Sequence, residues 1–184
     1  MSGANGSHGD TGAPGARCDS PADSCHPLEV ASLSPAQTQA VAGRLASVLR
    51  SGDVVLLGGD LGAGKTTFTQ GLARGLGVTE VVSSPTFTLV RSYDTDAGFD
   101  LLHADVYRLE QLHEVIDLAL PEQLDAGACA VIEWGERAQE AVGPDHLDVW
   151  LDYGGETEER IITLSPVGAG WAGRKRELVG AVSR

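Results

Sequence analysis

Apolar residues follow two different spacings along this chain. The run VVLL at 54–57 and the run from Cys129 to Trp134 are almost continuously apolar, which predicts buried strands. After Ser34-Pro35, apolar residues recur at helical spacing as far as Ser51-Gly52, and they do so again over 67–76 before Gly77. Each of these two stretches therefore predicts an amphipathic helix that begins or ends at a recognisable capping residue.

Two further regions have the pattern of antiparallel strand pairs. Strand-like runs at 86–93 and 99–107 flank a five-residue, Gly-containing connection, and runs at 147–153 and 160–165 flank Gly154-Gly155-Glu156. Apolar residues between 112 and 120 predict a short helix, and Pro121 begins another turn. Because strand–helix alternation occurs together with hairpins, we predict an α/β fold with a mixed parallel and antiparallel sheet flanked by helices.

The two ends of the chain differ in composition from its middle. Residues 1–27 contain almost no large apolar side chains, so we expect a disordered N-terminal tail. Residues 166–184 are rich in glycine and carry a basic triplet, and we expect a mobile C-terminal tail. One domain is left at 28–165. Signal-peptide features and an apolar stretch of about 18 residues are both absent, which favours a cytoplasmic protein without membrane contact.

Charge and cysteine content exclude several classes of function. The net charge is −13, and residues 94–159 hold eighteen Asp and Glu against two Arg. Such a surface repels a phosphate backbone, so contact with RNA should be indirect, through a partner protein. The acidic surface could equally serve solubility alone. The three cysteines and five histidines have no spacing typical of a disulfide framework or a zinc site.

The strongest chemical signal is the sequence GDLGAGKT at 59–66, which fits the phosphate-binding pattern G-x-x-x-x-G-K-[ST]. It lies between a predicted strand and a predicted helix, the arrangement of a P-loop NTPase fold. Glycines let backbone N–H groups surround an anion, Lys65 adds positive charge, and Thr66 offers a hydroxyl to Mg²⁺. The predicted nucleotide-binding residues are Asp60, Leu61, Gly62, Ala63, Gly64, Lys65, Thr66 and Thr67.

Turnover also needs an acid near the metal ion. Asp105 and Glu133 each end an apolar run, and the residue pattern does not place either of them beside Thr66. Thr86, in the turn Ser84-Pro85-Thr86, is a candidate for sensing the γ-phosphate. Three scattered arginines could stabilise transition-state charge, and none is singled out: Arg91, Arg108 and Arg137.

Two other features refine this interpretation. Trp134 follows Glu133 directly, so alternation along a strand predicts that it faces the opposite side, in the core or at an interface. The guanine-reading motif Asn-Lys-x-Asp is absent, because the only asparagine is Asn5 and the only lysines are Lys65 and Lys175. ATP is therefore favoured over GTP.

Four segments in this order resemble the bacterial TsaE family, also called YjeE. They are GDLGAGKTT at 59–67, SPTFTLV at 84–90, HADVYRL at 103–109 and IEW at 132–134. The resemblance extends from about Leu33 to Ser165 and leaves out both tails. It implies a P-loop ATPase with weak intrinsic hydrolysis that is stimulated by TsaD and TsaB, the proteins that make threonylcarbamoyladenosine (t6A) in tRNA.

The resemblance also implies roles for individual residues. Lys65 would bind phosphates, Thr66 and Glu133 would hold Mg²⁺, and Asp105 and Thr86 would line the γ-phosphate side. Two alternatives stay open. A small-molecule P-loop phosphotransferase would need an acceptor pocket and an Arg-rich lid, which the sequence does not reveal. A nucleotide-binding interaction module without turnover would keep its ATP unhydrolysed.

Overall fold

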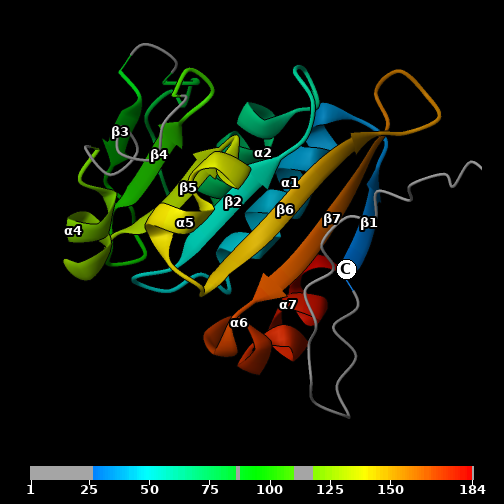
Figure 1. Ribbon diagram of the computed structural model, residues 1–184. Coiled ribbons are helices and arrows are strands. Elements are labelled where there is room, and N and C mark those ends of the chain that lie inside the picture. The colour runs from blue at the N-terminus through cyan, green and yellow to red at the C-terminus, as the bar shows by residue number, and fades with distance from the viewer. Residues whose placement is uncertain (1–26, 86–87, 110–117, 184) are drawn as a thin grey trace, which may run out of the picture.

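The computed structural model describes residues 27–85, 88–109 and 118–183 (Figure 1). The tail expected at 1–27 lies outside these ranges except for Pro27, and so do Thr86 and most of the helix expected between 112 and 120. The strands are β1 (Leu28–Ser32), β2 (Val54–Gly58), β3 (Val90–Tyr93), β4 (Leu101–Asp105), β5 (Cys129–Glu133), β6 (His146–Tyr153) and β7 (Arg160–Val167). The helices are α1 (Pro35–Ala46), α2 (Lys65–Gly75), α4 (Leu120–Asp125), α5 (Gln139–Val142), α6 (Ala169–Gly173) and α7 (Lys175–Val182), with a 3₁₀ helix η1 (Gly135–Arg137).

All seven strands form one mixed sheet in the order β1-β7-β6-β2-β5-β4-β3. The central strands β6, β2, β5 and β4 are parallel to one another, whereas β3, β7 and β1 run antiparallel to their neighbours. The predicted mixed α/β sheet is therefore confirmed, and so are both hairpins, β3–β4 and β6–β7. Strand β1 was not predicted. It pairs with β7 at the edge of the sheet.

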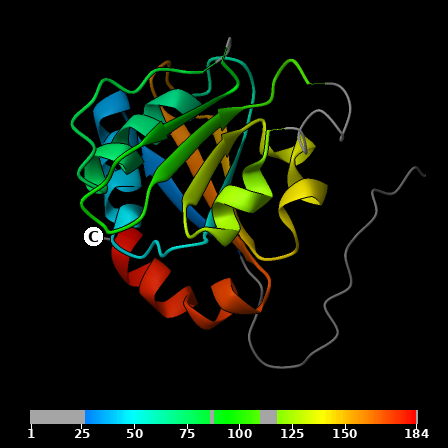
Figure 2. The same cartoon turned by 90° about the vertical axis from the view of Figure 1, so that its left-hand side faces the viewer.

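Helices cover the two faces of the sheet (Figure 2). On one face α1 and α2 pack over a large apolar cluster that includes Phe68, Leu72 and Val131. On the other face, the short elements η1, α4 and α5 pack over the cluster around Leu56 and Ile132. Every residue of β2, β4 and β5 is buried, as expected for central parallel strands that are covered on both faces.

The helix before the phosphate-binding loop begins as predicted and ends earlier. The Ser34 hydroxyl accepts a bond from the backbone N–H of Gln37, and Pro35 occupies the first turn. The helix stops at Ala46, and the N–H groups of Ser47, Val48 and Leu49 then bond to carbonyl oxygens three residues back, the tighter pattern with which many helices end. In the ranges that the structure describes, no helix is long and apolar enough to cross a bilayer.

The expectation of a mobile tail at 166–184 is wrong for the described part of that segment. Strand β7 continues to Val167, and α6 and α7 pack against the domain with Trp171, Leu178 and Val182 each 1 % exposed. Arg174 forms two hydrogen bonds with Asp53, of 2.6 and 2.7 Å, and its guanidinium lies 4.1 Å from the centre of the Trp171 ring. Contacts with residues far away in sequence order this segment, so its glycine-rich composition was misleading.

We expect Arg174→Met to lower the free energy of unfolding by about 3 kcal/mol, because it leaves the buried Asp53 carboxylate without its partner. The hydrogen bond to this carboxylate raises the pKa of Arg174, because it stabilises the charged guanidinium. Urea denaturation measures the change. Arg176→Met is the matched control, since Arg176 is exposed and should change stability by no more than about 0.5 kcal/mol. Equal effects of the two substitutions would show that α7 does not depend on this ion pair.

Candidate functional site

The loop at 59–64 joins the carboxyl end of β2 to α2 and leaves the start of that helix open to an anion. Gly64, the residue before α2, has φ 107° and ψ 21°, a left-handed conformation that favours glycine, and no side chain caps the helix. The N–H groups of Lys65, Thr66 and Thr67 open the helix and, like the first amides of any α-helix, have no carbonyl within it to bond. These amides and the helix dipole favour a phosphate at this position.

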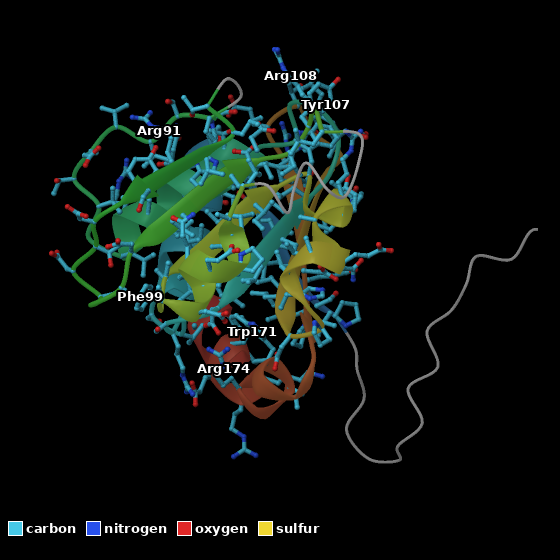
Figure 3. The ribbon with its side chains drawn as sticks, turned by 60° about the vertical axis from the view of Figure 1, so that its left-hand side comes forward. Arg91, Phe99, Tyr107, Arg108, Trp171 and Arg174 are labelled. Atoms are coloured by element: carbon cyan, nitrogen blue, oxygen red, sulfur yellow. The ribbon has the colours of Figure 1, made fainter. Side chains whose placement is uncertain are left out.

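A cavity of about 440 Å³ lies beside this loop, where the parallel strands β2, β4 and β5 end. Such a volume is typical of a small-ligand site. It is lined by Leu61, Gly62, Gly64, Lys65, Thr66, Thr67, Ser84, Asp105, Tyr107, Arg108, Glu133 and Trp134. Figure 3 shows Tyr107 and Arg108 at one end of the molecule and the C-terminal residues Trp171 and Arg174 at the other. The cavity therefore occupies the edge of the sheet at which α/β proteins bind their ligands.

Lys65 is buried at the floor of the loop, with an exposed fraction of 5 %. Its ammonium nitrogen Nζ donates to the carbonyl oxygens of Gly59, at 2.6 Å, and of Asp60, at 2.9 Å. Nζ also lies 3.7 Å from the centre of the Trp134 ring. Burial lowers the pKa of Lys65, and the negative charge of Glu133 opposes that shift. A polyanionic ligand would strengthen the charged form further.

Trp134 packs at the edge of the apolar cluster around Leu56 and Ile132, as predicted, but it also lines the cavity, which was not predicted. Its backbone leaves the strand in a left-handed conformation, with φ 62° and ψ 39°. This turn places the indole against the ammonium of Lys65 and 4.8 Å from the centre of the Tyr107 ring. The residue pattern contains no signal for a left-handed tryptophan, so the contribution of this ring to the cavity emerged only from the structure.

Glu133 contacts the hydroxyl of Thr66. The Thr66 Oγ1 atom lies 2.8 Å from Oε1 and 3.1 Å from Oε2 of the carboxylate, which is itself 5 % exposed. On the neighbouring strand β4, the fully buried His103 places Nε2 2.9 Å from Oε1 of Glu133. Its other ring nitrogen, Nδ1, has no partner among the described residues, which fits an imidazole whose proton is on Nε2. His103 thereby donates to the carboxylate and holds its orientation.

Asp105 lies beside Glu133 in the strand register and makes different contacts. Its carboxylate accepts a bond from the Ser84 hydroxyl, at 2.7 Å, and one from the N–H of Tyr107, at 3.1 Å. Asp105 thus links the end of β4 to the Ser-Pro-Thr turn, whose Thr86 lies outside the described residues. Of the two candidate acids, the structure brings Glu133 to Thr66 and Asp105 to the turn.

The three candidate arginines lie in different surroundings. Arg108 is exposed and lines the cavity. Arg137 donates to the carbonyl oxygens of Tyr107, at 2.6 Å, and Leu109, at 3.0 Å, which supports the segment after β4. Arg91 donates to the hydroxyl of Ser83 at 3.4 Å. A fourth arginine, Arg160, contacts the phosphate-binding loop itself, and sequence reasoning missed it because it lies nearly a hundred residues further along the chain.

The oxygen donors at the cavity fit a magnesium ion that arrives with a nucleotide. Mg²⁺ is usually held by one or two protein oxygens, with phosphates and water completing its octahedron. The Thr66 hydroxyl and the Glu133 carboxylate, already within 3.1 Å of each other, are such a pair. Among the described residues, no group of three or more His, Cys, Asp or Glu side chains could hold a metal ion by itself.

Comparisons with known proteins agree with this architecture. The family model described as "Threonylcarbamoyl adenosine biosynthesis protein TsaE" matches residues 32–162. The tRNA threonylcarbamoyladenosine biosynthesis protein TsaE of Bacillus subtilis is 41 % identical over 141 residues, which cover 77 % of this chain and 87 % of that protein. The protein of the same name from Streptomyces coelicolor is 45 % identical over 134 residues, covering 70 % and 90 %.

The fold has a close counterpart among solved structures. The crystal structure of Bacillus subtilis YdiB superposes with a TM-score of 0.70 at 34 % sequence identity, and the match covers 85 % of this chain and 97 % of YdiB. The described domain and the phosphate-binding loop thus have a P-loop NTPase-like fold in common with YdiB. On the family match and these relatives, the chain belongs to the TsaE family.

Proposed function

We propose that this protein is the ATP-binding and ATP-hydrolysing subunit of tRNA threonylcarbamoyladenosine biosynthesis and that it acts with the TsaD and TsaB proteins. Membership of the TsaE family supports the pathway. The observation that best supports the chemistry is the contact between the Thr66 hydroxyl and the Glu133 carboxylate at the mouth of the loop. Because the substrate of the pathway is tRNA, we propose that the protein acts in the cytoplasm.

Each group at the cavity has a defined part in this proposal. The open amides of α2 and the Lys65 ammonium bind the β- and γ-phosphates. Thr66 and Glu133 hold Mg²⁺, which when bound neutralises charge on the phosphates. Asp105 holds Ser84 at the lining of the cavity, and Thr86, two residues further along the chain, is the residue that we expect to sense the γ-phosphate.

A role within a complex agrees with the charge of the chain. Residues 94–159 carry eighteen acidic side chains and two arginines, so direct binding to tRNA is unfavourable. We therefore propose that tRNA is reached through the partner proteins and that this subunit supplies ATP turnover without transferring the carbamoyl group itself. The names of the relatives do not favour a small-molecule phosphotransferase.

The test is the ATPase rate of the full chain with and without its proposed partners. Mixing it with TsaD and TsaB should raise the rate by at least about tenfold, which corresponds to about 1.4 kcal/mol of activation free energy. The Lys65→Ala variant in the same mixture is the control for contaminating ATPases. Labelled ATP should yield free phosphate and no labelled small-molecule product. A rate that both partners leave unchanged would refute the proposal.

A further inference from the structure

The turn end of the β6–β7 hairpin contacts the phosphate-binding loop through Tyr153 and Arg160. Its last register pair is Tyr153 and Arg160, and the guanidinium carbon lies 4.5 Å from the centre of the tyrosine ring. The Tyr153 hydroxyl donates to the carbonyl oxygen of Leu61 at 2.8 Å. In Figure 1 the turn between β6 and β7 and the loop that leads into α2 lie at the same end of the molecule.

Arg160 donates hydrogen bonds both to the phosphate-binding loop and to the turn between β6 and β7. Nε donates to the carbonyl oxygen of Ala63 at 2.9 Å, and Nη2 lies 3.4 Å from that of Gly62. On its other side, Nη1 donates to the carbonyl oxygens of Thr157, at 3.0 Å, and Glu159, at 2.7 Å, within the hairpin turn. The rigid guanidinium therefore fixes the phosphate-binding loop to the hairpin turn through backbone oxygens alone.

From these contacts we infer that Tyr153 and Arg160 are positioning residues that hold the phosphate-binding loop in the shape that receives a phosphate. The inference rests on the proposed function, in which this loop binds a nucleotide. Neither residue would need to touch the nucleotide, since both act on the carbonyl oxygens of the loop.

The geometry of the peptide bond explains how such anchoring works. In a planar trans peptide the C=O and the next N–H point to opposite sides. Fixing the carbonyl of Leu61 toward Tyr153 turns the N–H of Gly62 away from the hairpin, and fixing that of Ala63 toward Arg160 does the same for Gly64. The N–H of Ala63 bonds within the loop, to Asp60. The anchored carbonyls of Leu61 and Ala63 therefore leave the N–H groups of Gly62 and Gly64 directed away from the hairpin, where an anion can accept from them.

Gly62 permits the close approach of the tyrosine. Its φ is 81°, and a Cβ atom at this position would lie 3.0 Å from the Tyr153 hydroxyl oxygen. Arg160 also contributes charge, because within the described ranges no carboxylate lies within ion-pair distance of it. Because this guanidinium bonds only to neutral carbonyl groups, no carboxylate neutralises its positive charge. That charge lies beside the phosphate-binding loop and favours a bound polyanion.

The test is the dissociation constant of Mg·ADP, of Mg·AMP and of a non-hydrolysable Mg·ATP analogue, measured by calorimetry on the full chain. Tyr153→Phe removes one anchor and should weaken Mg·ADP binding about fivefold. Arg160→Met removes two anchors and a charge, and should weaken it about 30-fold. Arg160→Lys keeps the positive charge but lacks the planar guanidinium with its several donors. The affinity of this variant for Mg·ADP should therefore lie between those of Arg160→Met and the wild type.

Two control substitutions remove the same groups elsewhere. Tyr93→Phe removes a buried hydroxyl that has no hydrogen-bond partner among the described residues. Arg50→Met removes an exposed guanidinium that is paired with Glu177. Neither should change the affinity for Mg·ADP. The ratio of ADP to AMP affinity is the readout that a purely structural role would not move, and it should fall in the Tyr153 and Arg160 variants alone.

The outcomes separate this inference from the proposed function. If the wild-type chain binds none of the three nucleotides, the proposed function fails, and the inference fails with it. If the wild type binds them and Tyr153→Phe and Arg160→Lys match it in affinity and in the ADP-to-AMP ratio, the positioning role is overturned and the proposed function stands. These two conservative variants decide the question even if Arg160→Met does not fold.

Discussion

Lys65→Ala is expected to weaken binding of Mg·ATP and Mg·ADP by about 100-fold. The substitution removes the ammonium that lies at the floor of the loop, held by the carbonyl oxygens of Gly59 and Asp60 and by the Trp134 ring. Loss of one partner of a desolvated, hydrogen-bonded charge pair typically costs 2 to 5 kcal/mol, and about 100-fold in affinity corresponds to about 2.7 kcal/mol. Isothermal titration calorimetry on the full chain measures the change.

The chain offers a matched control for this experiment. Lys175 is the only other lysine, and it lies in α7, after the end of β7 that is remote from the loop. Lys175→Ala removes the same charge, and the nucleotide affinity should stay within about twofold of the wild type. If both substitutions weakened binding equally, overall charge would explain the effect, and the ammonium of Lys65 would have no specific role.

Glu133→Gln is expected to lower the rate of ATP turnover by about 1000-fold while the nucleotide affinity changes less than about threefold. Glutamine retains an oxygen that can accept the bond from the Thr66 hydroxyl, so the shape of the cavity is preserved. It loses the negative charge that we propose as the protein's contribution to holding Mg²⁺. Single-turnover assays give the rate, and calorimetry with and without EDTA gives the affinity.

Two comparisons make the assignment of Glu133 specific. Glu140→Gln changes an exposed glutamate in α5 and should leave both quantities unchanged. Chelation of Mg²⁺ should abolish turnover in the wild type. The assignment would be contradicted if Glu133→Gln weakened binding as strongly as Lys65→Ala does, or if turnover survived in Glu133→Gln and disappeared in Asp105→Asn.

Features that depend on neighbouring residues were predictable from the sequence. The loop at 59–66 was recognisable because all of its phosphate-binding groups lie in eight consecutive residues between an apolar run and a helical pattern. Both hairpins were recognisable because their turns are short and contain glycine. Strand β1 was missed, since five residues at the edge of a sheet carry too little pattern to distinguish a strand from a loop.

Features that depend on distant contacts were not predictable in this way. The segment of α6 and α7 is rich in glycine, and its order depends on Asp53 and on the apolar cluster under α1, both far away along the chain. Trp134 turns out of its strand in a left-handed conformation that residue type disfavours. Arg160 reaches the loop across the β6–β7 hairpin.

The sequence by itself determined that this chain has a P-loop, a mixed α/β sheet and two candidate acids, because each of these depends on local spacing and residue chemistry. The tertiary structure decided which acid meets Thr66. Strand β5 pairs directly with β2, whereas β4 lies one strand further away, so Glu133 reaches the start of α2 and Asp105 reaches the Ser-Pro-Thr turn. Strand order results from the packing of the whole chain, and no stretch of a few residues encodes it.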